Sequence, residues 1–239
     1  MSTSATLEKL KKMRLPGMRQ AYSALLDSNQ TSSMTADEVL SHLVEREWEN
    51  RANSRLNQLL KAARLRYNVT LEYVSFKPER NLDKQEFIRL CECEFIRQNK
   101  NICISGATGS GKSYLVSVLG QHACLFGHKV RYFNCIKFFP FLEQAKADGS
   151  YVKIIKSLEK VNLLILDDFG LEAITHTVRI ALLEILDEKT TNGAIIAASQ
   201  IPTEKWHQLI GEPTLADAIC DRLFHKAIKI NLQGENMRK

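Results

Sequence analysis

The sequence lacks a long apolar run. In a chain of 239 residues that is 44% hydrophobic and 25% charged, no stretch approaches the roughly 18–20 apolar residues of a membrane-spanning helix. The first residues, Met1 to Lys12, also lack the apolar segment of a secretory signal. We therefore expect a globular protein of the cytoplasm, with no membrane partner.

Cysteine is too sparse and too scattered to build a framework. Of the six cysteines, only Cys91 and Cys93 lie close together, and no second pair follows to complete a zinc site. The six histidines show no metal-ligand spacing either. We expect reduced cysteines that act as small apolar side chains, because a cytoplasmic chain of this size needs no disulfides.

Acidic residues are outnumbered by basic ones. The chain has 33 lysines and arginines against 27 aspartates and glutamates, for a net charge of +6. This excess favours an anionic partner, of which nucleic acid is the most common. ATP is itself anionic, so the charge alone does not decide between them.

Residues 1–80 are predicted to be helical and contain no convincing strand. Pro16-Gly17 breaks the first segment, and Thr35 with Glu38 forms a capping box. Apolar residues then recur at helical spacing, which predicts a long amphipathic helix ending near Arg66. The residues of this row are Leu40, Val44, Trp48, Ala52, Leu56, Leu59, Leu60 and Ala63.

Residues 81–239 are predicted to alternate between strands and helices. A second capping box, Asp83 with Glu86, opens a helix through about Arg97. Apolar strands separated by helices indicate an α/β fold, a parallel sheet of about five strands covered on both faces. The predicted strands are 102–105, 130–133, 163–166, 194–198 and 227–230, and the predicted helices are 113–125, 137–146, 152–158, 178–189 and 214–224.

A complete phosphate-loop motif, G-x-x-x-x-G-K-[ST], follows the first predicted strand and opens a helix. Its backbone N–H groups and the helix N-terminus favour phosphate, Lys112 is expected to reach the β- and γ-phosphates, and the Ser113 hydroxyl is expected to ligate Mg²⁺. ATP and Mg²⁺ are therefore the expected ligands. The loop consists of Gly106, Ala107, Thr108, Gly109, Ser110, Gly111, Lys112 and Ser113.

Two carboxylates, Asp167 and Asp168, end the strand at 163–166. Ligands of open α/β sheets bind at the carboxyl ends of the strands. We expect Asp167 to hold Mg²⁺ and Asp168 to orient or deprotonate the attacking water. Ser199 and Gln200 end the next predicted strand, and either could sense the γ-phosphate.

Two arginines near the end of the chain are candidate phosphate contacts. Arg222 could reach the ATP of a neighbouring subunit as an arginine finger, or form a surface ion pair with Asp217 or Asp221. Arg238 could contact phosphate within its own subunit, or belong to a frayed basic tail. Charge alone leaves both pairs of interpretations open.

A basic stretch without any acidic residue lies between Asn50 and Leu71. Positive charge on one side of a packed helix suits a DNA backbone, in contacts that carry no sequence specificity. A solvated face or a helix that binds an acidic protein would show the same pattern. The candidate DNA-binding residues are Arg51, Arg55, Lys61, Arg64 and Arg66.

Together these segments resemble the IstB-like ATPases, the AAA+ helper proteins of one group of bacterial insertion sequences, related more distantly to DnaC helicase loaders and the DnaA initiator. The most specific part is late in the chain, where no generic phosphate-loop protein would share the sequence. The similar segments are Arg14–Met18, Leu59–Leu65, the phosphate loop, Leu163–Gly170, Ser199–Pro202, His207–Arg222 and Gly234–Lys239. Serine at positions 110 and 113 and Gln200, where many AAA+ proteins have asparagine, are departures.

This resemblance implies an AAA+ domain at 81–239 after a helical N-terminal domain at 1–80. It implies a homo-oligomer with ATP at the subunit interfaces, which assembles on duplex DNA and recruits and stimulates a DDE transposase. Arg222 then looks like the finger and Arg238 like a second arginine sensor. A helicase-loader-like adaptor and a small-molecule kinase are the alternative functions.

Overall fold

The computed structural model describes residues 3–28, 34–234 and 236–237. The chain falls into two compact units, Met1–Gln58 and Leu59–Lys239, so the expected domain boundary after residue 80 lies inside the second unit. Nowhere in the described ranges does a helix combine the length and apolar character that crossing a membrane requires.

The first unit contains helices α1 (Thr3–Lys12), α2 (Pro16–Asp27) and most of α3 (Ala36–Ala63). Pro16 stands in the first turn of α2, where a missing N–H group is tolerated, so the predicted break is confirmed. Glu47 of α3 accepts hydrogen bonds from the backbone N–H groups of Gly17, at 2.8 Å, and Met18, at 3.2 Å. A carboxylate from α3 thereby caps the start of α2.

Helix α3 begins as predicted. The Thr35 N–H donates to Glu38 at 2.7 Å, and the Glu38 N–H donates to the Thr35 hydroxyl at 3.3 Å. The predicted packing face is wrong in part, however, because Leu40, Val44 and Trp48 are 58%, 48% and 72% exposed. Helical spacing therefore predicted the helix correctly but did not show whether its apolar row is covered.

The second unit is built on five parallel strands in the order β2-β3-β4-β1-β5, which confirms the expected α/β class. This order makes β4 the neighbour of both β1 and β3. Because the strands are parallel, the loop after β1 and the acidic end of β3 lie at the same end of the sheet, where the strands have their carboxyl ends. The strands are β1 (Ile102–Gly106), β2 (Val130–Asn134), β3 (Leu163–Asp167), β4 (Ala194–Ser199) and β5 (Ile228–Leu232).

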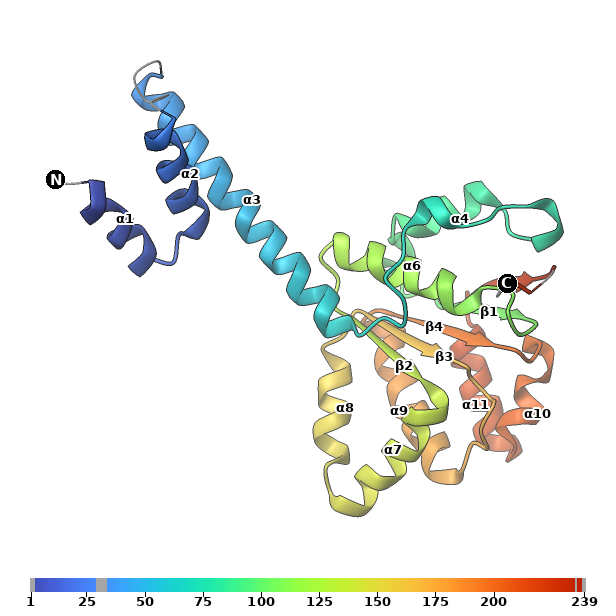
Figure 1. The fold of residues 1–239 in the computed structure, drawn as a ribbon. Helices are drawn as coiled ribbons and strands as arrows, with labels where there is room; N and C mark the ends of the chain where they lie inside the picture. The colour runs from blue at the N-terminus through green and yellow to red at the C-terminus, as the bar shows by residue number, and fades with distance from the viewer. Residues whose placement is uncertain (1–2, 29–33, 235, 238–239) are drawn as a thin grey trace. The chain divides into compact units, whose positions relative to one another are not determined.

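Helices cover both faces of this sheet. Figure 1 shows α4 and α6 on one face and α7 to α11 on the other. Residues Leu164, Leu166 and Ile195 pack in the core of the second face, and every strand residue of β3 is buried. The helices are α4 (Lys84–Cys91), α5 (Glu94–Arg97), α6 (Lys112–Leu125), α7 (Cys135–Asp148), α8 (Tyr151–Glu159), α9 (His176–Thr191), α10 (Trp206–Ile210) and α11 (Pro213–Phe224), with short 3-10 turns η2 (Leu71–Tyr73), η3 (Pro78–Arg80) and η4 (Thr203–Lys205).

Two local predictions need correction. The helix expected from Asp83 to Arg97 is interrupted: Asp83 caps α4 by accepting the Glu86 N–H at 2.7 Å, but Cys93 adopts a left-handed φ of 63° and separates α4 from α5. Helix α10 was not expected, and its Trp206 is fully buried in the core.

All six cysteines are free, as predicted. Five are buried and Cys220 is half-buried. Burial raises the pKa of the Cys91, Cys93 and Cys103 thiols to about 12. These side chains therefore act as small apolar groups.

Candidate nucleotide-binding site

The phosphate loop joins β1 to α6. Gly109 and Gly111 have φ values of 81° and 89°, a left-handed conformation that side chains rarely adopt. Lys112, the first residue of α6, is buried, and its Nζ donates to the carbonyls of Gly106, at 2.7 Å, and Ala107, at 2.9 Å. The Met237 N–H donates to the Gly109 carbonyl at 2.8 Å, so Met237 lies against the loop.

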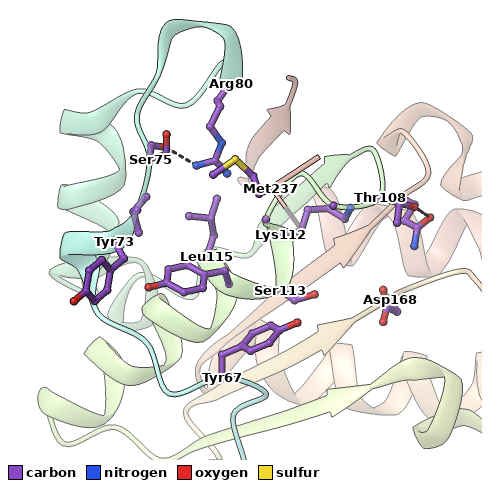
Figure 2. A pocket seen from close by; sticks show the side chains of 15 residues that line it. Tyr67, Tyr73, Ser75, Arg80, Thr108, Lys112, Ser113, Leu115, Asp168 and Met237 are labelled. Atoms are coloured by element: carbon purple, nitrogen blue, oxygen red, sulfur yellow. Dashed lines mark hydrogen bonds between the residues drawn. The ribbon is translucent and has the colours of Figure 1, made fainter. Parts of the chain in front are cut away.

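A cavity of about 260 Å³ opens beside this loop. Lys112, Ser113 and Asp168 line it beside aromatic and apolar side chains (Figure 2). The other polar lining residues are Ser75, Arg80, Thr108 and Gln200. An apolar wall beside a cationic phosphate loop suits a ligand that joins a flat base to phosphates. The apolar lining consists of Tyr67, Tyr73, Val74, Tyr114, Leu115 and Met237.

The acidic pair is held by neighbouring side chains. Asp167 is fully buried, and its Oδ2 accepts a 2.7 Å hydrogen bond from the Tyr132 hydroxyl. Asp168 has a left-handed φ of 57°, and its Oδ2 accepts a 2.6 Å bond from the Asn134 amide. Burial, together with the bond to Asp167, raises the pKa of Tyr132, so this phenol stays protonated and donates.

Arg66 also lies at this site, although sequence reasoning placed it among DNA contacts. One guanidinium nitrogen, Nη1, is 3.5 Å from Ser113 Oγ, 3.5 Å from Asp167 Oδ2 and 3.3 Å from Asp168 Oδ2. A positive group therefore stands where a hydroxyl and two carboxylates converge.

These donors fit Mg²⁺. They are oxygen ligands, which Mg²⁺ prefers, and the Arg66 guanidinium shows that the place between them accepts a cation. Among the residues the structure describes, no group of three or more histidine, cysteine, aspartate or glutamate side chains could hold a metal.

The two sensor candidates differ in position. Ser199 is fully buried, and its hydroxyl donates to the Phe169 carbonyl at 2.6 Å and accepts from the Ile201 N–H at 3.0 Å. Gln200 lines the cavity, and its Oε1 accepts a 2.5 Å bond from the Thr108 hydroxyl of the phosphate loop. The structure thus brings Gln200, and not Ser199, to the cavity.

Of the two late arginines, Arg222 has a partner that the sequence did not suggest. Its Nε donates to Asp187 of α9, and its Nη1 donates to the Ala218 carbonyl at 3.0 Å. Asp217 instead bonds His207 at 2.8 Å. Arg238 lies outside the described residues.

The other basic candidates are exposed. Arg51 pairs with Glu47 at 2.8 Å but keeps 64% of its side chain exposed. Arg55 is also in the first unit, whereas Lys61 and Arg64 belong to the second. Their exposure leaves these four side chains accessible to an anionic partner.

Several site residues were not predicted from the sequence, among them the cavity-lining Tyr67 and Tyr73. Tyr132 and Asn134 of β2 orient the acidic pair. Strand β2 is the neighbour of β3, so the strand order, had it been known, would have indicated both residues. Arg80 also lines the cavity, and its buried side chain supports the phosphate loop, because its Nη2 donates to the Ser110 carbonyl at 2.7 Å. No sequence signal marked Arg80.

Known proteins resemble this chain over nearly its whole length. The sequence model of the family "IstB-like ATP binding protein" matches residues 8–239. A putative insertion sequence ATP-binding protein of Sinorhizobium fredii is 40% identical over 234 residues, covering 98% of this chain and 96% of that protein. The insertion sequence IS21 putative ATP-binding protein of Pseudomonas aeruginosa is 26% identical over 229 residues, covering 96% and 86%.

Solved structures show the same fold at low identity. DnaI matches with a TM-score of 0.59 and 20% identity, over 74% of this chain and 94% of that one. AMPPCP-bound DnaA from Aquifex aeolicus matches with a TM-score of 0.61 and 22% identity, over 72% and 52%. The fold is that of AAA+ proteins, and the chain belongs to the family of IstB-like ATP-binding proteins, as an AAA+ ATPase.

Proposed function

We propose that this ATPase, when loaded with ATP and Mg²⁺, assembles on duplex DNA and recruits and stimulates a DDE transposase for the movement of an insertion sequence. The observation that best supports this proposal is that the phosphate loop and Asp168 line one cavity in a chain of this family. ATP binding drives assembly because the nucleotide lies between subunits, and hydrolysis weakens that interface.

The cavity residues divide the chemistry between them. The loop amides and Lys112 bind the phosphates, while Tyr67 and Tyr73 flank the base. Ser113 and Asp167 would hold Mg²⁺, which when bound offsets negative charge on the β- and γ-phosphates. Asp168 orients the attacking water or accepts its proton.

Gln200 is the better placed γ-phosphate sensor, since it already contacts Thr108 of the loop. Arg222 acts on the ATP of a neighbouring subunit. Arg222 is not among the described residues that line the nucleotide cavity of its own subunit. Arg238 is kept as a second sensor on the strength of the family resemblance alone.

The exposed cations Arg51, Arg55, Lys61 and Arg64 are proposed to contact DNA phosphates. Such contacts carry no sequence specificity and weaken steeply with salt. Arg66 is not proposed as a DNA contact, because its side chain faces the acidic pair.

A gel-shift with duplex DNA of random sequence tests the proposal. The protein is compared with ATP, a slowly hydrolysed analogue, ADP and no nucleotide. Binding is expected with ATP or the analogue only, and is expected to be lost in Lys112→Ala. Lys137→Ala, which removes one exposed lysine of α7, is the matched control for net charge.

The partner is tested by pull-down with a DDE transposase and with a replicative helicase. Capture of the transposase by ATP-loaded protein supports the proposal. Capture of the helicase alone contradicts it and favours the helicase-loader alternative. An ATP-loaded protein that stays monomeric with DNA present also contradicts it.

A further inference from the structure

The segment that follows α3 crosses the nucleotide site. Arg64 ends the helix with a left-handed φ of 53°. Arg131 of β2 donates to the Ala62 carbonyl at 2.8 Å, and Leu65 lies against Gly120 of α6, where a Cβ atom on the glycine would come within 2.7 Å of the leucine side chain. The backbone before Arg66 is therefore anchored to both β2 and α6.

The backbone after Arg66 is anchored as well. The rings of Tyr67 and Tyr114 lie 6.5 Å apart, and the Tyr114 hydroxyl donates to the Thr70 carbonyl at 3.0 Å. With anchors on both sides, the backbone position of Arg66 follows from the fold of the second unit.

The contacts of Arg66 are those of a loosely held counter-ion. Its Nη1 reaches three oxygen-bearing groups at 3.3–3.5 Å, and 34% of the side chain stays exposed. A tight arginine–carboxylate pair would use two nitrogens at shorter distances. The acidic pair thus has a positive neighbour that can leave without breaking a strong bidentate bond.

The same oxygens are the donors that fit Mg²⁺. Mg²⁺ binds oxygen at about 2.0–2.1 Å, and a guanidinium within 3.5 Å of all three groups would repel it. We propose that Arg66 is a resident cation of the ATPase site, which competes with the divalent metal for Ser113, Asp167 and Asp168. The inference rests on the proposed Mg²⁺–nucleotide site. It adds that Arg66, which lies outside both the phosphate loop and β3, sets the divalent-ion concentration that this site requires.

The positive charge of Arg66 also helps to hold the acidic pair in place. Two adjacent carboxylates beside a buried strand end repel each other unless a positive charge is near. Arg66 supplies that charge, alongside the bonds from Tyr132 and Asn134. Arg66 is therefore a positioning residue as well as a competitor.

The test is a Mn²⁺ titration of the full-length chain with ADP, in which electron paramagnetic resonance counts the free ion and no turnover is needed. Arg66→Gln is expected to lower the half-saturating Mn²⁺ concentration about three- to tenfold, and Arg66→Lys to stay near the original protein. Arg89→Gln, at an exposed arginine of α4, controls for net charge and should leave the value unchanged.

An unchanged or higher Mn²⁺ requirement in Arg66→Gln overturns the inference, and the higher value would mean that Arg66 supports the bound nucleotide instead. The proposed nucleotide site has a separate test. If the original protein binds neither Mn²⁺ with ADP nor fluorescent ATP, that site fails. If it binds both and Arg66→Gln titrates identically, only the role of Arg66 fails.

Discussion

The side-chain amide nitrogen of Asn134 donates a 2.6 Å hydrogen bond to Oδ2 of Asp168, and the side-chain oxygen Oδ1 of Asn134 accepts one from the Ile136 N–H at 3.1 Å. The second bond caps α7, so Asn134 holds Asp168 from a fixed point. Asp168 itself has a left-handed backbone, a conformation that few residues other than glycine, asparagine and aspartate accept readily. The backbone conformation of Asp168 and its hydrogen bond from Asn134 together fix the orientation of the carboxylate.

Asp168→Asn is expected to lower the rate of ATP hydrolysis by about 10²- to 10⁴-fold, because it removes the group that orients or deprotonates water. Fluorescent ATP should still bind, since asparagine tolerates the same backbone conformation. Asn134→Ser, which keeps a helix cap but loses the amide donor, should lower kcat a few-fold with little change in KM. Hydrolysis by Asp168→Asn at the original rate would place water activation on another residue.

Arg222 has two candidate roles, as an arginine finger and as the partner of Asp187 in a structural ion pair, and substitution of each residue distinguishes them. Arg222→Ala should leave ATP binding by the single subunit intact but reduce hydrolysis in the assembly by at least about tenfold, if the guanidinium acts as a finger. Asp187→Asn removes the charge of the partner and leaves at most a neutral hydrogen bond, so the guanidinium is held less firmly and hydrolysis should be kept or raised. Phosphate release measured over a range of protein concentrations checks this. Equal loss of thermal stability in both variants, without an effect specific to assembly, would indicate a structural pair only.

The acid stability of the first unit should depend on Glu47. Burial alone raises the pKa of this carboxyl, but the bonds from Arg51 and from the Met18 and Gly17 N–H groups outweigh it, and the pKa lies below its ordinary 4.5. A depressed folded-state pKa means that the stabilisation is complete above that ordinary value and is lost as the pH falls through the folded-state pKa. Glu47→Gln should cost about 1–2 kcal/mol at pH 7 and flatten this dependence.

Thermal melts of the helical signal between pH 3 and pH 7 measure the effect. Glu49→Gln is the control, because Glu49 forms only an exposed pair with Arg46 on the same helix. Equal pH profiles for the original protein and Glu47→Gln would contradict the role given to Glu47.

Gly17 is expected to be required for packing. A Cβ atom there would lie 2.4 Å from the Arg46 carbonyl oxygen and 2.8 Å from the Glu47 Cα, both backbone atoms that cannot move aside cheaply. Gly17→Ala should destabilise the first unit by about 1–3 kcal/mol. Limited proteolysis should then cleave residues 1–58 faster, while ATP binding is retained. Gln20→Ala, on the exposed side of α2, should behave like the original protein.

Local patterns predicted several helix starts, the phosphate loop and the strand before Asp167. The glycines and lysine of residues 106–113, the apolar run before Asp167 and the capping residues Thr35 and Asp83 each act within a few positions of the chain. Their physical consequences are therefore readable from the sequence. The same holds for the parallel sheet, because alternating apolar strands and helices leave few other arrangements.

Contacts between distant positions could not be predicted in this way. Arg66 and Asp168 are separated by 102 positions, and Arg222 and Asp187 by 35. A basic residue in a basic stretch carries no mark that it folds back onto carboxylates. The left-handed turn at Cys93 was missed for a related reason, since nothing in its local sequence opposes a continuous helix.

The cysteine environment determines how the protein can be labelled. Thiol reagents attack the thiolate, and a thiol with a pKa of about 12, as at Cys91, Cys93 and Cys103, is a thiolate in only about one molecule in 10⁵ at pH 7. Cys124 and Cys135 are also buried, with raised pKa values. Replacing the half-buried Cys220 by serine would therefore leave a chain on which a single introduced cysteine, for instance at the exposed Lys137, can carry a fluorophore selectively.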